Sequence, residues 1–239
     1  MNVGPHILEA AHAHALREYP REACGLVVRL PLGGPSDMYW PCVNLADGQA
    51  HFILCPQDYA RAEEAGEVVG IVHSHPNGAP EPSSADRVMM EQWGVPWLII
   101  SAPLGHSAWH YPTGYEAPLV GRPFSHGVLD CFSLIRDYYR LTLGITLPEF
   151  DRPDDWWAKG ANLYLDNYHS AGFRDVGDSP PQAHDVILMQ VRSKVPNHGA
   201  VYLGDDVILH HVMNRLSRRE VYSGFWSKIT THILRHSSL

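Results

Sequence analysis

Two histidines and an aspartate are spaced in the sequence as ligands of a metal ion would be. His73 and His75 stand one residue apart, and Asp86 follows. Residues i and i+2 of a strand point to the same face, so a strand that delivers this pair would project both imidazoles together. Two imidazoles and one carboxylate are the three-ligand set of a catalytic zinc, which keeps its fourth position open. The prediction is a Zn²⁺ site; the alternative is a chance His-x-His in a chain with 16 histidines.

Hydrolysis at such a site also needs a general base and a group that stabilises the oxyanion. Zinc lowers the pKa of a bound water to about 7. Glu22 begins a strand that could pair near the strand of His73, which makes Glu22 the candidate base. The alternative is an exposed carboxylate between a helix and a strand. Ser83 could donate to the oxyanion, a contribution of about 2.7–4 kcal/mol. Its alternative role is a helix N-cap, which is open to Ser83 or Ser84.

A second candidate site centres on Cys131, which stands where a loop enters a predicted helix. A helix N-terminus lowers the pKa of a thiol and favours the nucleophilic thiolate. Such a nucleophile needs a histidine as base and a third polar group that orients it. A predicted hairpin begins with His198 and ends with His210 and His211, so it offers both. His198 is the candidate base; spacing favours His210 as the orienting group, and His211 is the alternative.

The elements that must position these residues follow from periodicity and turn residues. In the first part of the chain, helices are predicted at 5–19, 56–64 and 83–92, and strands at 22–28, 38–44, 51–54, 67–74, 95–101 and 107–111. In the second part, helices are predicted at 131–141, 154–157 and 162–168, and strands at 184–190, 198–203, 207–211, 219–222 and 228–236. The fold class is therefore α+β, with a first sheet that is not purely parallel.

Charge divides the chain in two and excludes several classes of function. Up to residue 117 there are 5 Arg, no Lys and 13 Asp or Glu, whereas the remainder is balanced. Neither half has the basic excess of a nucleic-acid binder. No run is long and apolar enough for a membrane span, and residues 1–6 lack the pattern of a signal peptide. Three of the four cysteines lie in the acidic half, where buried thiols are favoured over disulfides.

The first motif set resembles the JAMM motif of MPN-domain metallopeptidases. The residues that carry the resemblance are Glu22, His73, His75, Ser83 and Asp86, with Ala23-Cys24-Gly25 after Glu22. The resemblance implies a domain over residues 1–112 with a mixed sheet and flanking helices. It also implies zinc on the two histidines and the aspartate, Glu22 as general base and Ser83 as oxyanion stabiliser. Enzymes of this family cleave peptide or isopeptide bonds.

The second motif set resembles the NlpC/P60 family of papain-like cysteine peptidases. Its matching pieces are Asp130-Cys131, His198 with the Val-Tyr-Leu-Gly of its predicted strand, and His210. The resemblance implies a domain over residues 122–239 with helices and an antiparallel sheet. The prolines and glycine near residues 112–118 and the break in charge predict a linker at 113–121 before it. That family hydrolyses cell-wall peptides, typically next to a D-glutamyl or diaminopimelate residue.

The order of the two domains is similar to that of the tail tip assembly protein K family of lambda-like phages. This resemblance implies a virion protein that is assembled in the host cytoplasm and acts at the host periplasm or cell wall. Its expected partners are other tail tip proteins and peptidoglycan, with no nucleic acid and no membrane span. One alternative is a structural plug or scaffold with one or both sites inactive. Another is a bacterial enzyme of small-protein processing.

Overall fold

The computed structural model describes residues 4–31, 37–48 and 51–239 of the chain. Residues 1–3, on which the expectation of no signal peptide partly rests, lie outside this part. The chain divides into two units, Met1–Glu116 and Ala117–Leu239. The division falls inside the segment 113–121, whose assignment as a linker stays a prediction. None of the helices in the described ranges combines the length and apolar character that a membrane crossing requires.

The first unit is built on a five-stranded mixed sheet with the strand order β2-β1-β3-β4-β5. Strands β3 and β4 pair in parallel and the other pairs are antiparallel, so the expectation of a sheet that is not purely parallel is confirmed. The strands are β1 Cys24–Arg29, β2 Asp37–Cys42, β3 Glu67–Pro76, β4 Trp97–Ala102 and β5 Ser107–His110. The helices are α1 Pro5–Glu18, α2 Pro56–Ala65 and α3 Ser84–Trp93.

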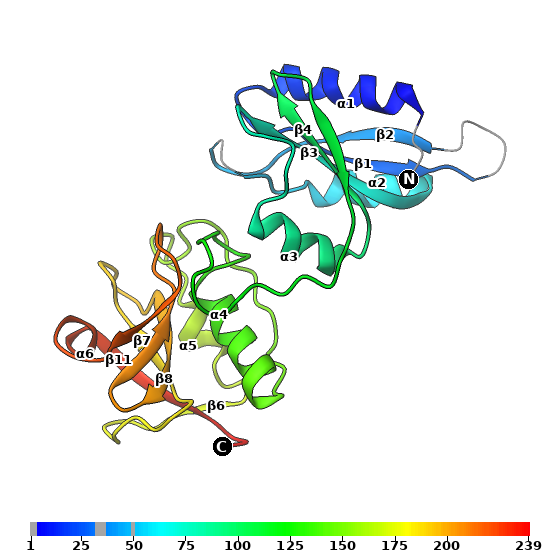
Figure 1. Cartoon of the computed structure of the whole chain (residues 1–239). Coiled ribbons are helices and arrows are strands. Elements are labelled where there is room, and N and C mark those ends of the chain that lie inside the picture. The colour runs from blue at the N-terminus through cyan, green and yellow to red at the C-terminus, as the bar shows by residue number, and fades with distance from the viewer. Residues whose placement is uncertain (1–3, 32–36, 49–50) are drawn as a thin grey trace. The chain divides into compact units, whose positions relative to one another are not determined.

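Helices cover both faces of this sheet (Figure 1). Helix α1 packs on one face, where its Ile7 and Ala11 meet Val72 and Leu98. On the opposite face, Ala62 of α2 and Met90 of α3 pack with alternate strand residues, because successive strand side chains point to opposite faces. The unbroken buried runs of β1 and β4 follow from this two-sided cover.

Two predicted elements are corrected by the structure. The strand predicted at 51–54 is reduced to a single bridge between Asn44 and Leu54. The helix predicted at 154–157 consists of turns. The cysteines are free; Cys24 and Cys42 are buried as expected, whereas Cys55 is only partly buried.

The second unit carries a six-stranded antiparallel sheet with the order β10-β9-β8-β7-β11-β6. Its strands are β6 Phe173–Asp175, β7 Val186–Met189, β8 His198–Gly204, β9 Val207–His210, β10 Arg218–Val221 and β11 Thr230–His236. Its helices are α4 Cys131–Tyr138, the π-helix η1 Tyr139–Leu143, α5 Leu163–Asn167 and α6 Phe225–Lys228. Both units therefore have the predicted α+β class.

Helix α4 forms the main core of the second unit with the sheet. Leu134 and Ile135 of α4 pack with Val201 of β8 and Leu209 of β9. Alternate residues of the same strands point to the other face, where Ala200 and other buried residues pack with Trp226. Helix α4 therefore brings its first residue, Cys131, to the sheet at β8.

Candidate functional site

The side chains of His73, His75 and Asp86 converge at the end of β3. The Nε2 atoms of the two histidines lie 2.9 Å apart. Asp86 places one carboxylate oxygen 3.5 Å from Nε2 of His73 and the other 3.4 Å from Nε2 of His75. A tetrahedral zinc with bonds of about 2.0–2.1 Å keeps its ligand atoms roughly 3.3 Å apart. The three residues therefore fit a zinc ion.

Neighbouring groups hold each of these side chains in a ligating orientation. Nδ1 of His75 lies 2.9 Å from the carbonyl oxygen of Ala79, to which it donates when Nε2 carries the free lone pair. Phe52 stacks on the His73 ring with centroids 4.9 Å apart. Asp86 is held by a capping box with Ser83, the N-cap of α3, in which each side chain accepts from the other's backbone N–H.

The charges of the three groups suit cation binding. Burial would raise the pKa of Asp86, but hydrogen bonds with both histidines outweigh burial and lower that pKa. Burial lowers the pKa of His73, which keeps its imidazole neutral. Burial also acts to lower the pKa of His75, but its hydrogen bonds with Asp86 and the Ala79 carbonyl, together with nearby negative charge, outweigh burial and raise that pKa. An ionised carboxylate beside two imidazoles is a ligand set suited to a divalent cation.

The register of β1 brings Glu22 next to this cluster. Cys24 lies opposite His73 in the antiparallel pair, so Glu22, two residues earlier, faces the side of His75. Glu22 is buried, with 8% of its surface exposed, which excludes the alternative of an exposed carboxylate. Burial raises its pKa to about 7, with opposing effects from His75 and Asp86. A carboxylate with this pKa is poised to exchange a proton near neutral pH.

In the second unit, a capping box begins the helix that carries Cys131. The Asp130 side chain accepts from the backbone N–H of Ser133 at 2.8 Å, and Ser133 Oγ accepts from the N–H of Asp130 at 2.8 Å. The helix approaches β8 closely at Gly199, where an added Cβ would lie 2.8 Å from Ile135 Cδ1. A larger residue at this position would require the end of the Ile135 side chain to move, so the glycine favours the close approach of the helix to the start of β8.

The thiol of Cys131 has a raised pKa, so the expected lowering at the helix N-terminus is wrong. Burial is the largest cause, and the Asp130 carboxylate adds to it. These effects outweigh hydrogen bonds from Tyr164 and the Gly199 backbone. Sγ lies 3.2 Å from Tyr164 Oη. Within the described part of the chain, no hydrogen bond joins Cys131 to His198.

The two strands of the hairpin bring His198 and His210 together. Nε2 of His198 lies 3.2 Å from Nδ1 of His210, and Nε2 of His210 lies 3.0 Å from a Glu220 oxygen. His211 follows the end of β9; its Nε2 lies 3.1 Å from the carbonyl oxygen of Arg215, and its ring packs edge-on against Phe124. Of the two candidates for the orienting group, His210 is therefore the one that contacts His198. Burial and the neighbouring histidines lower the pKa of His198 to about 3.

Two known protein families match the chain, one in each unit. Residues 5–111 match the family described as prokaryotic homologs of the JAB domain, and residues 121–235 match the NlpC/P60 family. A desampylase of Haloferax volcanii is 34% identical over 121 residues, which cover 46% of this chain and 83% of the relative.

Two relatives match across both units. The tail tip assembly protein K of Escherichia phage N15 is 40% identical over 235 residues, which cover 97% of this chain and 95% of the relative. The chain belongs to the tail tip assembly protein K family. The member from phage lambda is 44% identical over 183 residues, which cover 77% of this chain and 89% of the relative.

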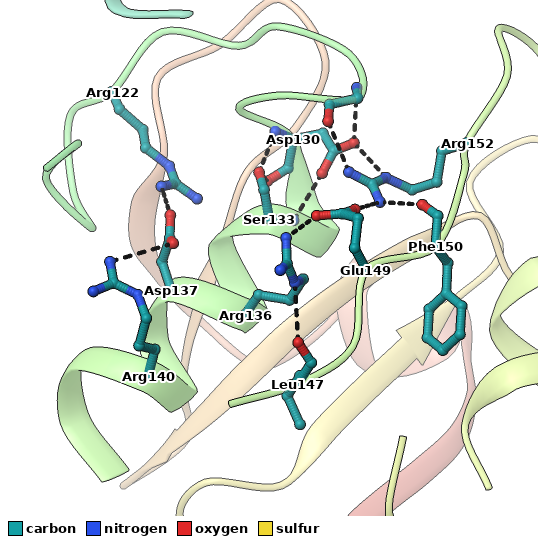
Figure 2. Close-up of polar contacts among 11 residues, drawn as sticks. Arg122, Asp130, Ser133, Arg136, Asp137, Arg140, Leu147, Glu149, Phe150 and Arg152 are labelled. Atoms are coloured by element: carbon teal, nitrogen blue, oxygen red, sulfur yellow. Dashed lines mark hydrogen bonds and ion pairs between the residues drawn. The ribbon is translucent and has the colours of Figure 1, made fainter. Parts of the chain in front are cut away.

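In this member of the tail tip assembly protein K family, an arginine secures the start of the cysteine helix (Figure 2). Arg152 Nε donates to the Asp130 carboxylate at 2.9 Å, and its Nη2 donates to the carbonyl oxygen of Gly127 at 2.9 Å. Arg152 also donates to the carbonyl oxygen of Phe150 at 2.7 Å and pairs with Glu149. Burial would raise the pKa of Asp130, but the charge of Arg152 and the hydrogen bonds from Ser133 and Arg152 together outweigh burial and lower the pKa.

Replacing Arg152 with methionine is expected to destabilise the second unit by about 3–5 kcal/mol, because the buried Asp130 carboxylate loses its charged partner. Hydrogen exchange of the slowest amides in β7 and β8 would report this loss without assuming a single unfolding step for both units. Arg174→Met, at an exposed arginine of the same unit, is the matched control. Equal protection in the Arg152 and Arg174 variants would contradict the expectation.

The Arg152 effect should also depend on pH. The folded pKa of Asp130 is depressed, so its stabilisation is present above the ordinary Asp pKa of about 3.9 and is lost as the pH falls through the folded value. In the Arg152→Met variant, protonation of Asp130 instead removes the cost of burying an unpaired carboxylate. The difference in stability between the parent and the variant should therefore shrink from pH 7 to pH 4.

Sequence reasoning did not identify Arg152, Tyr164 or Glu220 as members of the cysteine site. Tyr164 lies in the predicted helix 162–168, and its place between two leucines is the signal that could have singled it out. Arg152 and Glu220 reach the site from a loop and an edge strand, and no spacing relative to Cys131 points to them.

Proposed function

We propose that the second unit is a cysteine endopeptidase that cuts peptidoglycan stem peptides and opens the host cell wall locally for DNA delivery. The observation that carries the proposal is the hydrogen bond between His198 and His210, on strands packed against the helix that starts with Cys131. A papain-like peptidase requires a thiol, an imidazole and a third polar group that orients the imidazole, and His210 supplies the third group here.

In this mechanism His198 takes the proton of the Cys131 thiol, and the sulfur attacks the carbonyl carbon of the scissile amide. His198 then gives the proton to the leaving amine, so the C–N bond breaks and a thioester remains. A water that transfers a proton to His198 hydrolyses the thioester and restores the thiol. Catalytic hydrogen bonds are commonly longer before substrate binds. This accounts for a Cys131 thiol that contacts the Tyr164 hydroxyl rather than His198.

We place this activity at the phage tail tip, with other tail tip proteins as partners. The protein would be assembled in the host cytoplasm, carried in the virion and brought to the host periplasm or cell wall on infection. The names of the N15 and lambda relatives, which match most of the chain, support this placement.

For the first unit we propose a zinc-dependent peptidase or isopeptidase. His73, His75 and Asp86 would hold the ion, and zinc supplies Lewis-acid chemistry for hydrolysis at neutral pH when it is bound. Glu22, whose pKa is raised to about 7, would accept a proton and return it to the leaving amine. The Ser83 hydroxyl, whose oxygen accepts from Asp86, retains its own proton for the oxyanion. The similarity to a desampylase supports a hydrolase role.

A digest of purified peptidoglycan tests the assignment of the two units. The parent protein and a Glu22→Gln variant are expected to release the same shortened stem peptides, cut next to D-glutamyl or diaminopimelate, as read by mass spectrometry. A Cys131→Ala variant should release none. Equal release by the Cys131 variant would remove the cysteine assignment. Intact peptidoglycan in all three digests would favour a structural role at the tail tip.

A further inference from the structure

Glu220 lies in the edge strand β10, next to the histidine pair. Its carboxylate is 3.0 Å from His210 Nε2, and Arg218 donates to the same oxygen from Nη2 at 2.7 Å. The Trp226 side chain adds a further hydrogen bond to this carboxylate. Trp226 also packs edge-on against the His210 ring, with centroids 4.7 Å apart. The carboxylate is thus fixed from three sides.

Glu220 is ionised at neutral pH. Burial would raise its pKa, but hydrogen bonds from Trp226, His210 and Arg218 outweigh burial and lower the pKa. An ionised carboxylate can only accept hydrogen bonds. Nε2 of His210 must therefore carry the proton of this contact.

The protonation of His210 determines that of His198. With its proton on Nε2, neutral His210 presents the lone pair of Nδ1 to His198 Nε2, 3.2 Å away. His198 must then carry its own proton on Nε2, which leaves Nδ1 as the free acceptor. This is the tautomer in which His198 is able to take a proton from a thiol. In the reverse tautomer of His210, Nδ1 would donate and His198 would lose that capacity.

We propose that Glu220 is a positioning residue of the cysteine site, which fixes the tautomer of His210 and through it that of His198. This inference rests on the proposed peptidase function of the second unit. The negative charge of Glu220 also offsets the positive charge that His198 acquires when it takes the thiol proton. Such an offset matters because His198 and His210 are buried, with 6% and 0% of their surfaces exposed.

Alkylation of Cys131 by iodoacetamide, followed by peptide mass spectrometry across pH, tests the proposal without requiring substrate turnover. Glu220→Gln is expected to move the midpoint of the alkylation profile up by about one pH unit. Below the midpoint this corresponds to roughly tenfold slower alkylation. Glu220→Asp, which keeps the charge, should restore part of the rate. The matched control is Asp175→Asn, at a carboxylate 4.0 Å from His232 in the same sheet.

Long-range ¹H–¹⁵N NMR of the full-length chain provides the second readout. His210 should be an Nε2–H tautomer in the parent and in Asp175→Asn, and should lose that preference in Glu220→Gln. A merely structural role for Glu220 would lower stability without changing the tautomer or the alkylation midpoint.

The outcomes separate the two levels of the proposal. Parent-like alkylation and an Nε2–H tautomer in Glu220→Gln would overturn the role of Glu220 while the peptidase site stands, provided that His198→Ala slows alkylation. Alkylation that is unchanged in His198→Ala would overturn the proposed cysteine site, and the role of Glu220 with it.

Discussion

Replacing Cys131 with alanine is expected to lower kcat for hydrolysis of a stem peptide by on the order of 10⁵-fold, because no other group in the site can form the thioester. His198→Ala should cost nearly as much. The pKa of the thiol is raised, so at neutral pH the thiol keeps its proton unless a base removes it. The double variant should lose little more than either single variant, since both residues act in one step.

Initial rates on a synthetic stem peptide, with products separated by mass spectrometry, would measure these losses. Cys55→Ala is the matched control, because Cys55 is also a partly buried free thiol but lies in the first unit. Its rate should equal that of the parent. A double variant whose loss equals the product of the two single losses would show that Cys131 and His198 act independently, against the proposed mechanism.

The metal cluster was the part of the molecule most accessible from sequence. The period of a strand places His73 and His75 on one face, and the start of a helix places Asp86 where its backbone can be capped by Ser83. Both rules involve only residues close in sequence, so they hold even where another element, such as the strand at 51–54, is predicted wrongly. The roles of these residues as ligands stay predictions.

The cysteine site was less accessible because its chemistry depends on contacts that are distant in sequence. The helix N-terminus at Cys131 suggested a lowered pKa, whereas burial against β8 raises it. The choice between His210 and His211 depended on where β9 ends: His210, its last residue, contacts His198, whereas His211 follows the strand and contacts the carbonyl oxygen of Arg215. Glu220 depends on a further strand pairing, β9 with β10, and therefore could not be inferred from motif spacing.

Loss of zinc is the second large effect expected. The full-length protein, purified from zinc-replete cells, should hold about one zinc per chain. His73→Ala and Asp86→Ala should each leave far less zinc. Removal of a residue that only hydrogen-bonds to a ligand already lowers metal affinity by roughly 10–100-fold, and removal of a ligand should lower it further. Metal content by mass spectrometry, after dialysis against a weak chelator, would measure the loss.

Two further variants separate ligand loss from nearby disturbance. His110 lies close to His73, but its own Nε2 is 2.7 Å from the carbonyl oxygen of Pro80. The His110→Gln variant should therefore retain zinc. Glu22→Gln should also retain zinc, since Glu22 is assigned to proton transfer rather than to ligation. A protein that binds zinc equally with and without His73 and Asp86 would refute the metal site. Zinc lost in Glu22→Gln would instead make Glu22 a ligand and leave the first unit without its proposed base.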